Sequence, residues 1–304
     1  MVHTAFPPRD RASQTAMQPS PDTSADSLSV KFWGVRGSVP TPTAANQRYG
    51  GNTVCVEVLI GHQRIIFDGG TGLVGLGHHL QHTPCNAHLF FTHTQWDRIQ
   101  GFPFFQPAFI PQNHFSIYGG TAPNGASIKH CLTDQMLQPH FTVPLQHMRA
   151  DLSFHTLSDR DSFHIGDIQV DTLKINHRTE ALGYRLTWQG HSLVYATDTP
   201  TEQIDLELLK FADQADLLIY DGTYCDLTYL YETDATKTAT QPWETGIEIA
   251  QKAHVKELIL LHHSPVQDDA TLDLLQTAVS DRFPTAKIAH EGMVLHQRYQ
   301  GRPV

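Results

Sequence analysis

Short apolar and β-branched runs recur along the chain and predict a series of strands. The predicted strands cover residues 30–33, 54–60, 64–67, 89–91, 115–118, 168–175, 182–188, 192–196, 217–220 and 257–261, with a last short strand near residue 288. Helical patterns begin near residue 73 and cover residues 126–137, 206–212, 242–254 and 270–282. Hairpins dominate the first half, whereas strands and helices alternate in the second. This order predicts an α/β fold in which two mixed sheets lie between helices.

Residues 1–27 break this pattern. They are rich in Pro, Ser, Thr, Ala and Asp and contain almost no aliphatic side chains. Such a segment cannot bury enough apolar surface to offset the entropy lost on ordering, so we expect a disordered tail. Since no break in composition divides the remainder, we expect a single domain over residues 28–304.

The net charge of the chain limits the kinds of molecule that it can bind. The 304 residues include 21 Lys and Arg against 31 Asp and Glu, which gives a net charge of -10. An acidic surface excludes broad binding to nucleic acid or to a membrane surface, because it cannot neutralise phosphates over a wide face. It is compatible with one small phosphate-bearing ligand. The chain also has 20 histidines, so a lone His carries little weight outside a motif.

The cysteines and the N-terminus indicate the compartment. Cys55, Cys85, Cys131 and Cys225 form no C-x-x-C pair, and no secretory signal precedes them. We therefore expect reduced thiols in a cytoplasmic protein. No apolar run approaches the length of a membrane span.

One polar cluster stands out after the strand predicted at residues 89–91. It contains His93, Gln95, Asp97 and Arg98, four different polar groups within six residues. Such a set at a strand end is not typical of packing. The aromatic and proline-rich run at residues 101–105 follows it. This run predicts either a hydrophobic wall beside a pocket or a loop held on the core.

Further polar residues follow other predicted strands. They are His177, Asp198 and His262. Each also has a purely structural interpretation: His262 as a surface residue, Asp198 as a helix N-cap, and Asp97 as the cap of a turn. Glycine runs at residues 34–40, 49–53 and 68–72 are likewise consistent with ordinary hairpin turns.

Taken in order, these residues resemble the metallo-β-lactamase superfamily, and the subgroup near ribonuclease Z and the cyclic-nucleotide phosphodiesterases. The stretch from His93 to Arg98 is similar to its signature His-x-His-x-Asp-His, and the glycine runs are similar to its opening segments. The resemblance covers about residues 28–295 and implies an αββα sandwich. It also implies a dinuclear metal hydrolase.

The resemblance assigns a role to each ligand position. The first metal would be held by His93, position 95 and His177, the second by Asp97, position 98 and His262, with Asp198 bridging the two. Gln95 replaces a ligand histidine with a weak neutral donor. Arg98 cannot ligate a metal, because its guanidinium has no lone pair to offer and is always charged.

These departures predict a changed site. We expect Arg98 to lie beside Asp97 and Asp198, where it would supply the charge of the second metal ion. The first site would hold one zinc or manganese ion at His93, His177 and Asp198, or no metal. Members of the subgroup carry a further histidine before the C-terminal helix, and this chain has Thr240 at that position. Asp221 matches a family element and is expected to line the pocket, without a role in the reaction.

Two functions follow from this reading. The first is a pseudoenzyme, whose pocket would bind a small anionic ligand through Arg98, Arg178, Asn52 and Thr240, or whose surface would bind a partner protein. The second is a metal-dependent hydrolase of the phosphodiesterase type, working with one metal ion or an atypical pair. In that enzyme Asp97, Arg98 and Asp198 would be catalytic, and Arg98 would stabilise the developing oxyanion.

Overall fold

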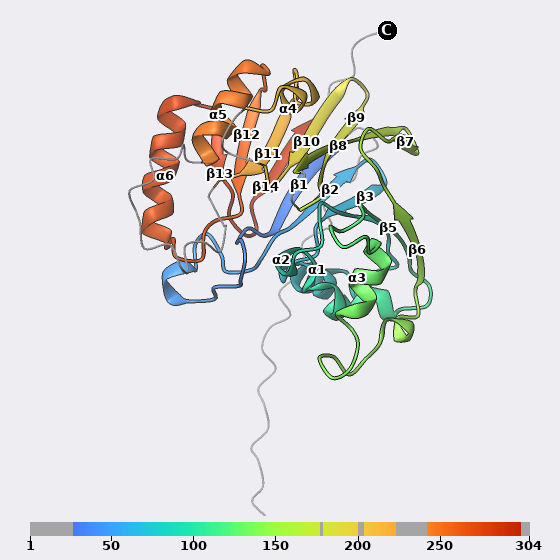
Figure 1. Cartoon of the computed structure of the whole chain (residues 1–304). Helices are drawn as coiled ribbons and strands as arrows, with labels where there is room; N and C mark the ends of the chain where they lie inside the picture. Colours follow the sequence, from blue (N-terminus) through green and yellow to red (C-terminus); the bar gives the residue numbers. More distant parts are fainter. Residues whose placement is uncertain (1–26, 177–178, 200–203, 223–241, 299–304) are drawn as a thin grey trace, which may run out of the picture.

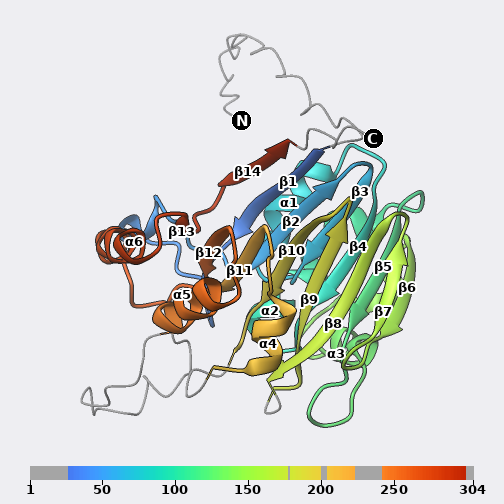
Figure 2. The same cartoon turned by 90° about the horizontal axis from the view of Figure 1, so that it is seen from above.

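The computed structural model describes residues 27–176, 179–199, 204–222 and 242–298. The first described residue, Ser27, already belongs to a strand, one residue before the predicted start of the domain. The rest of the predicted tail lies outside the described residues. The described part of the chain forms two sheets that face each other (Figures 1 and 2).

The first sheet has seven strands in the order β14-β1-β2-β3-β4-β5-β6. Their bounds are β1 (Ser27–Gly34), β2 (Cys55–Ile60), β3 (Gln63–Phe67), β4 (Asn86–Phe91), β5 (His114–Gly119), β6 (Asp151–Thr156) and β14 (Val294–Arg298). β3 to β6 run parallel to one another, and β1, β2 and β14 pair antiparallel.

The second sheet has seven strands in the order β13-β12-β11-β10-β9-β8-β7. Their bounds are β7 (Ser162–Ile165), β8 (Ile168–Asn176), β9 (Ala181–Trp188), β10 (His191–Ala196), β11 (Leu217–Asp221), β12 (Glu257–Leu261) and β13 (Ala286–Ile288). β10 to β13 run parallel, whereas β7, β8 and β9 form an antiparallel hairpin series.

Helices cover the outer face of each sheet. They are α1 (Gly72–Leu80), α2 (Trp96–Ile99), α3 (Ile128–Asp134), α4 (Leu206–Phe211), α5 (Pro242–Lys252) and α6 (Asp269–Arg282). α1 and α3 contact the first sheet, and α4, α5 and α6 contact the second (Figure 1). The fold is therefore an αββα sandwich, as the sequence pattern and the family resemblance predicted.

Three apolar layers hold the sandwich together. The middle layer lies between the sheets and includes a stack of aromatic rings in which Phe67 and Tyr195 lie 4.6 Å apart between centroids. Two outer layers lie between each sheet and its helices. Because Phe67 belongs to β3 and Tyr195 to β10, this stack fixes the two sheets against each other next to the strand ends described below.

The sequence pattern missed some short elements. β6, β7 and β14 were not predicted, and each is an end strand of its sheet. The residues of β6 are exposed or half-buried along its whole length, so β6 lacks the buried apolar run on which the prediction depended. The helix predicted at residues 126–137 is shorter, because α3 begins after the N-cap Ser127 and ends at Asp134. The short helix α2 was not predicted either.

Two further expectations from the sequence concern membrane spans and the cysteines. Among the residues that the structure describes, no helix is both long and apolar enough to span a membrane. Cys55, Cys85 and Cys131 are free thiols, and Cys55 and Cys85 are buried. Cys225 lies outside the described residues.

Candidate functional site

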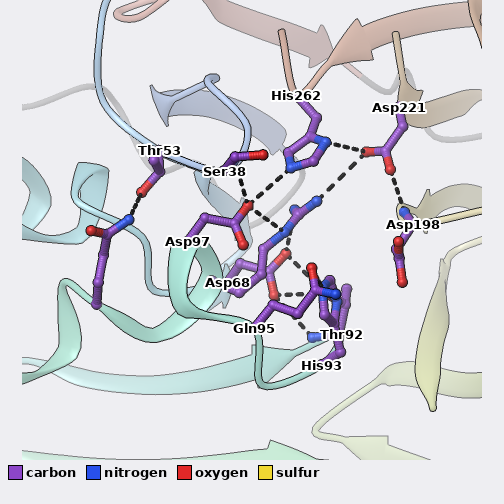
Figure 3. A network of polar contacts seen from close by, with 12 residues as sticks. Ser38, Thr53, Asp68, Thr92, His93, Gln95, Asp97, Asp198, Asp221 and His262 are labelled. Carbon is purple, nitrogen blue, oxygen red and sulfur yellow. Dashed lines mark hydrogen bonds and ion pairs between the residues drawn. The ribbon is translucent and has the colours of Figure 1, made fainter. Parts of the chain in front are cut away.

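Polar residues gather where the parallel strands of both sheets end. Asp68 follows β3, His93 follows β4, and Asp198, Asp221 and His262 lie at the ends of β10, β11 and β12. The carboxyl ends of these strands meet at one edge of the sandwich, so the sequence folds these side chains into one cluster (Figure 3). Strands hold such groups more rigidly than loops do.

The helix α2 brings in the remaining residues of the motif. Gln95 is its N-cap, and Asp97 and Arg98 lie within its single turn. The backbone fixes this turn against the segment after β3: the Gly69 amide donates to the Arg98 carbonyl at 2.6 Å, and the Gly101 amide donates to the Gly69 carbonyl at 2.8 Å.

Arg98 lies at the centre of the cluster and is 0% exposed. Its Nη1 donates to Asp68 Oδ2 at 3.0 Å, its Nε lies 3.5 Å from Asp97 Oδ2, and its Nη2 lies 3.7 Å from Asp221 Oδ1. Burial alone would lower the pKa of Arg98, but these carboxylates raise it well above its usual value. Arg98 is thus a permanent internal cation between three aspartates.

Asp68 is the closest partner of Arg98 and is fully hydrogen-bonded. It accepts from the Thr92 amide at 2.9 Å, from Thr92 Oγ1 at 2.9 Å and from the Tyr195 hydroxyl at 2.9 Å. Burial raises the pKa of Tyr195, and the charge of Asp68 raises it further, so the phenol stays protonated and keeps donating. Asp68 therefore joins β3 of the first sheet to β10 of the second.

Asp97 is paired with His262. The distance from His262 Nε2 to Asp97 Oδ2 is 2.9 Å, and the Ser38 amide donates to the same oxygen at 3.2 Å. Burial raises the pKa of Asp97, but the bond from His262 and the charge of Arg98 outweigh it and hold that pKa well below its usual range. Asp97 is therefore a carboxylate at neutral pH.

Asp221 and Asp198 form the far side of the cluster. Burial raises the pKa of Asp221, although His262 and Arg98 act against it, so this carboxyl holds a proton more readily than usual. The Asp198 amide donates to Asp221 Oδ2. The Asp198 side chain accepts from Asn176 Nδ2 at 3.1 Å and from Thr179 Oγ1.

The expected contact between Arg98 and Asp198 needs correction. Within the described residues, the ion pairs of Arg98 go to Asp68, Asp97 and Asp221. Among these residues, the hydrogen bond of Asp198 runs from its backbone amide to Asp221. Sequence reasoning missed Asp68 as the main partner and expected Asp221 only to line the pocket, although both follow a predicted strand, which was the available signal.

His93 and Gln95 of the motif face each other. His93 Nε2 lies 3.2 Å from Gln95 Oε1, and His93 Nδ1 lies 3.0 Å from Thr92 Oγ1. His177, the third residue expected at the first metal position, lies outside the described residues. Arg178 and Thr240, expected to bind a ligand, also lie outside them, so their roles stay predictions.

Asn52 is engaged elsewhere. Its side-chain amide donates to Glu291 Oε2 at 3.0 Å, and its backbone amide donates to Glu291 Oε1 at 2.5 Å. Its carbonyl accepts from the Val35 and Arg36 amides at 2.9 Å. These hydrogen bonds hold the glycine run at residues 49–53 against the turn before β14. The contacts of Asn52 in the structure therefore serve the fold.

Part of the strained backbone of the protein lies at the same edge. Asp68, Asp198 and His262 have φ values of 58°, 61° and 65°, in the left-handed region that side chains with a Cβ rarely adopt. Each such residue costs on the order of 1–3 kcal/mol, and such costs cluster at functional sites. Ser38, whose amide binds Asp97, shares this conformation with a φ of 60°.

The arrangement does not fit two metal ions. Arg98, a group that only donates, lies among Asp68, Asp97 and Asp221, and Asp97 and His262 bond to each other. Across the described ranges, which omit residues 177–178 and 223–241, no group of three or more His, Cys, Asp or Glu side chains converges as metal ligands do.

An αββα sandwich with polar residues at the ends of its parallel strands defines the metallo-β-lactamase class of fold. The sequence model of the β-lactamase superfamily domain matches residues 24–263. The chain therefore belongs to the metallo-β-lactamase superfamily.

Individual relatives agree with this assignment. Ribonuclease Z of Brevibacillus brevis is 32% identical over 106 residues, a match that covers 34% of this chain and 31% of that protein. The metallo-β-lactamase fold protein YhfI of Bacillus subtilis superposes with a TM-score of 0.63 at 19% identity, over 90% of this chain and 100% of that one. Zn²⁺-bound PqqB of Methylobacterium extorquens superposes with a TM-score of 0.61 at 14% identity, over 88% of this chain and 99% of that one. The chain thus spans about a third of its curated relative, and the structures support the fold.

Proposed function

We propose that this protein is a pseudoenzyme of the superfamily, a binding module without hydrolytic activity. The observation that carries the proposal is the environment of Arg98, which is 0% exposed and faces Asp68, Asp97 and Asp221. A divalent ion at this position would meet the guanidinium charge directly, and repulsion in a buried setting is strong. Arg98 thus takes over the electrostatic role of the second metal ion without its Lewis acidity.

The same geometry limits what Arg98 can bind. A buried guanidinium between three carboxylates has little charge left to attract an anion, and it has no exposed surface for contact. The small anionic ligand of this binding module therefore needs a different cationic surface. A partner protein is the other occupant that the sequence suggested for the module.

The alternative function is a one-metal hydrolase, with an ion at His93, His177 and Asp198. The facing pair of His93 and Gln95, whose Nε2 and Oε1 atoms lie 3.2 Å apart, is the observation that favours it. The relationship to a ribonuclease Z and the fold shared with a zinc protein also favour it. In that enzyme Arg98 would have to reach the substrate, whereas its guanidinium is enclosed.

Metal content and hydrolysis separate the two functions. We expect the protein, purified without chelator or affinity-tag metal, to contain no stoichiometric zinc or manganese by elemental analysis and not to cleave bis-p-nitrophenyl phosphate. One metal ion per chain, with hydrolysis that is lost in His177→Ala, would establish the one-metal enzyme and end the pseudoenzyme proposal.

A reversal experiment tests the cause. The double variant Gln95→His with Arg98→His restores the ligand types of the family signature, so it should gain bound zinc and measurable hydrolysis. Arg98→Lys is the matched control, because it keeps the positive charge and offers no ligand at neutral pH; it should bind no more metal than the wild type. A folded double variant that still binds no metal would show that these two residues are not what removed the centre.

A further inference from the structure

A cavity of about 350 Å³ lies beside α6, away from the Arg98 cluster. Its apolar lining consists of Tyr49, Ile288 and Met293. Its polar lining consists of Arg48, Lys287 and His290, with Gln276 of α6 between them. Small-molecule sites have volumes of about 300–1,000 Å³ and combine apolar walls with a few placed polar groups, so this cavity has the size and composition of such a site.

The charge of the lining is one-sided. Among the residues that the structure describes, no acidic side chain lines this cavity, although the whole chain carries a net charge of -10. A second hollow, of about 700 Å³, is lined by Arg185 and Lys256 and also by the carboxylate of Asp216. Of these two hollows, only the smaller one therefore favours an anion over a cation.

The polar groups of the cavity are held in place from outside it. Arg48 forms a two-pronged ion pair with Asp273 of α6, with Nη1–Oδ1 and Nη2–Oδ2 distances of 3.0 and 2.6 Å. Gln276 donates to Ser280 Oγ at 2.6 Å and accepts from the Ile288 amide at 2.7 Å. Groups that are already fixed lose little entropy when a ligand binds.

We propose that this cavity binds a small organic anion, namely an apolar body of about the size of one benzene ring that carries a single carboxylate or phosphate group. The apolar body packs on Tyr49, Ile288 and Met293, and the anionic group faces Arg48, Lys287 and His290. Neighbouring Asp273 and Glu257 weaken the field, because they pair with Arg48 and Lys287. We expect a Kd on the order of 0.1–1 mM for a probe of about 12 heavy atoms.

This site is independent of the metal question. The cavity shares no residue with the Arg98 cluster. Tyr49, which lines the cavity, packs edge-on against His263, with 6.1 Å between the ring centroids. The protein can therefore bind an anion here whether or not an ion occupies the strand ends, and either proposal can fail alone.

Methionine methyl signals report on the cavity directly. The chain has 5 methionines, so a protein labelled with ¹³C at the methionine methyls gives few signals. Met293 lines the cavity, whereas Met136 and Met148 are 0% and 6% exposed in the layer under the first sheet. Titration of the full chain with 4-phenylbutyrate should shift the Met293 signal in a saturable way and leave Met136 and Met148 unchanged. The cationic analogue 4-phenylbutylamine should bind at least tenfold more weakly.

Charge-reversal variants complete the test. Lys287→Glu combined with His290→Glu should weaken 4-phenylbutyrate at least tenfold, and the milder Lys287→Gln about threefold, in variants whose melting curves show that they are folded. Lys256→Glu, which alters a lysine of the second hollow, should stay within twofold of the wild type. The proposal is wrong if the Met293 signal does not move at 10 mM probe, if the amine binds as tightly as the carboxylate, or if Lys256→Glu weakens binding as much as the cavity variants.

Discussion

Arg98 shows how one side chain can change the chemistry of a site and keep its architecture. Its Nη1 bonds Asp68 at 3.0 Å, and Asp97 and Asp221 complete the ring of carboxylates. A buried ion pair is weak support for stability as a whole, but removal of one partner leaves the other charges unpaired. The aspartates therefore depend on Arg98 more than they would depend on a solvated lysine or arginine.

Arg98→Met tests this dependence. We expect the variant to lose about 3–5 kcal/mol of unfolding free energy in urea, because a similar volume remains while the aspartates lose their counter-charge. The loss should be larger at pH 8 than at pH 5, since carboxyls that repel one another accept protons as the pH falls. Arg282→Met is the matched control: its pair with Glu244 is exposed, and it should lose less than about 1 kcal/mol. Equal losses in the two variants would contradict a special role for Arg98.

The residues of the cluster were predictable as a set, but their pairing was not. A polar residue after an apolar strand can be read from the sequence, which is why His93, Asp198 and His262 were expected together. The choice of Asp68 as the partner of Arg98 depends on the reach of a long side chain across 30 positions of sequence. The link between Asp198 and Asp221 runs through the backbone amide of Asp198, and a backbone donor leaves no mark on the residue type.

The short helix α2 has only one turn, so its position depends on its neighbours. A Cβ built on Gly101 would lie 2.0 Å from the Gly70 carbonyl oxygen, which shows that the two backbones touch. The hydrogen bonds that the Gly69 and Gly101 amides donate run across this contact. This packing places Asp97 and Arg98 between the sheets, and it requires glycine for steric reasons.

Gly101→Ala should therefore destabilise the protein by about 1–3 kcal/mol or more in urea unfolding, because the backbones must separate. Gly75→Ala is the control within α1: its added Cβ meets only the Trp33 ring, at 3.6 Å, and alanine favours a helix by about 0.5–1 kcal/mol. We expect this control to be neutral or stabilising. Matching losses for both alanines would mean that the approach of α2 to Gly70 is not tight.

Element prediction succeeded for strands that are buried on both faces and failed at three of the four end strands, β6, β7 and β14. β11 and β12 lie inside the second sheet and are almost fully buried, so their sequences are continuous apolar runs. β6 and β7 end their sheets and carry polar residues, which natural edge strands use to limit aggregation. These strands pair through backbone bonds, and backbone bonding leaves little trace in a pattern of side chains.

At the scale of the whole molecule, two buried arginines connect the sheets at the edge where the strands end. Arg98 joins the segment after β3 to β11. Arg36, after β1, donates to the Gly50 carbonyl at 2.7 Å and to the Gln267 carbonyl, beyond β12, at 2.6 Å. Both bind groups from separate parts of the chain, so the edge that carries the candidate site also holds the sandwich closed.

His263 belongs to this closure and makes stability depend on pH. It is 0% exposed, its amide donates to the Val35 carbonyl at 2.9 Å, and its Nε2 lies 2.7 Å from the Ala289 carbonyl. Burial lowers the pKa of His263 to about 3. Below pH 6.5 the unfolded chain therefore binds a proton that the folded protein refuses, and stability falls as the pH decreases toward 3.

The size of this effect follows from the two pKa values. With about 6.5 in the unfolded chain and about 3 in the folded one, His263 should cost about 2 kcal/mol of unfolding free energy between pH 7 and pH 5. His263→Gln keeps a donor for the Ala289 carbonyl and removes the titration, so its stability should fall about 2 kcal/mol less over that interval. The exposed His82→Gln should follow the wild type. If the urea midpoints of wild type and His263→Gln fall in parallel between pH 7 and pH 5, then His263 titrates alike in both states, and the closed edge is not as dry as its burial indicates.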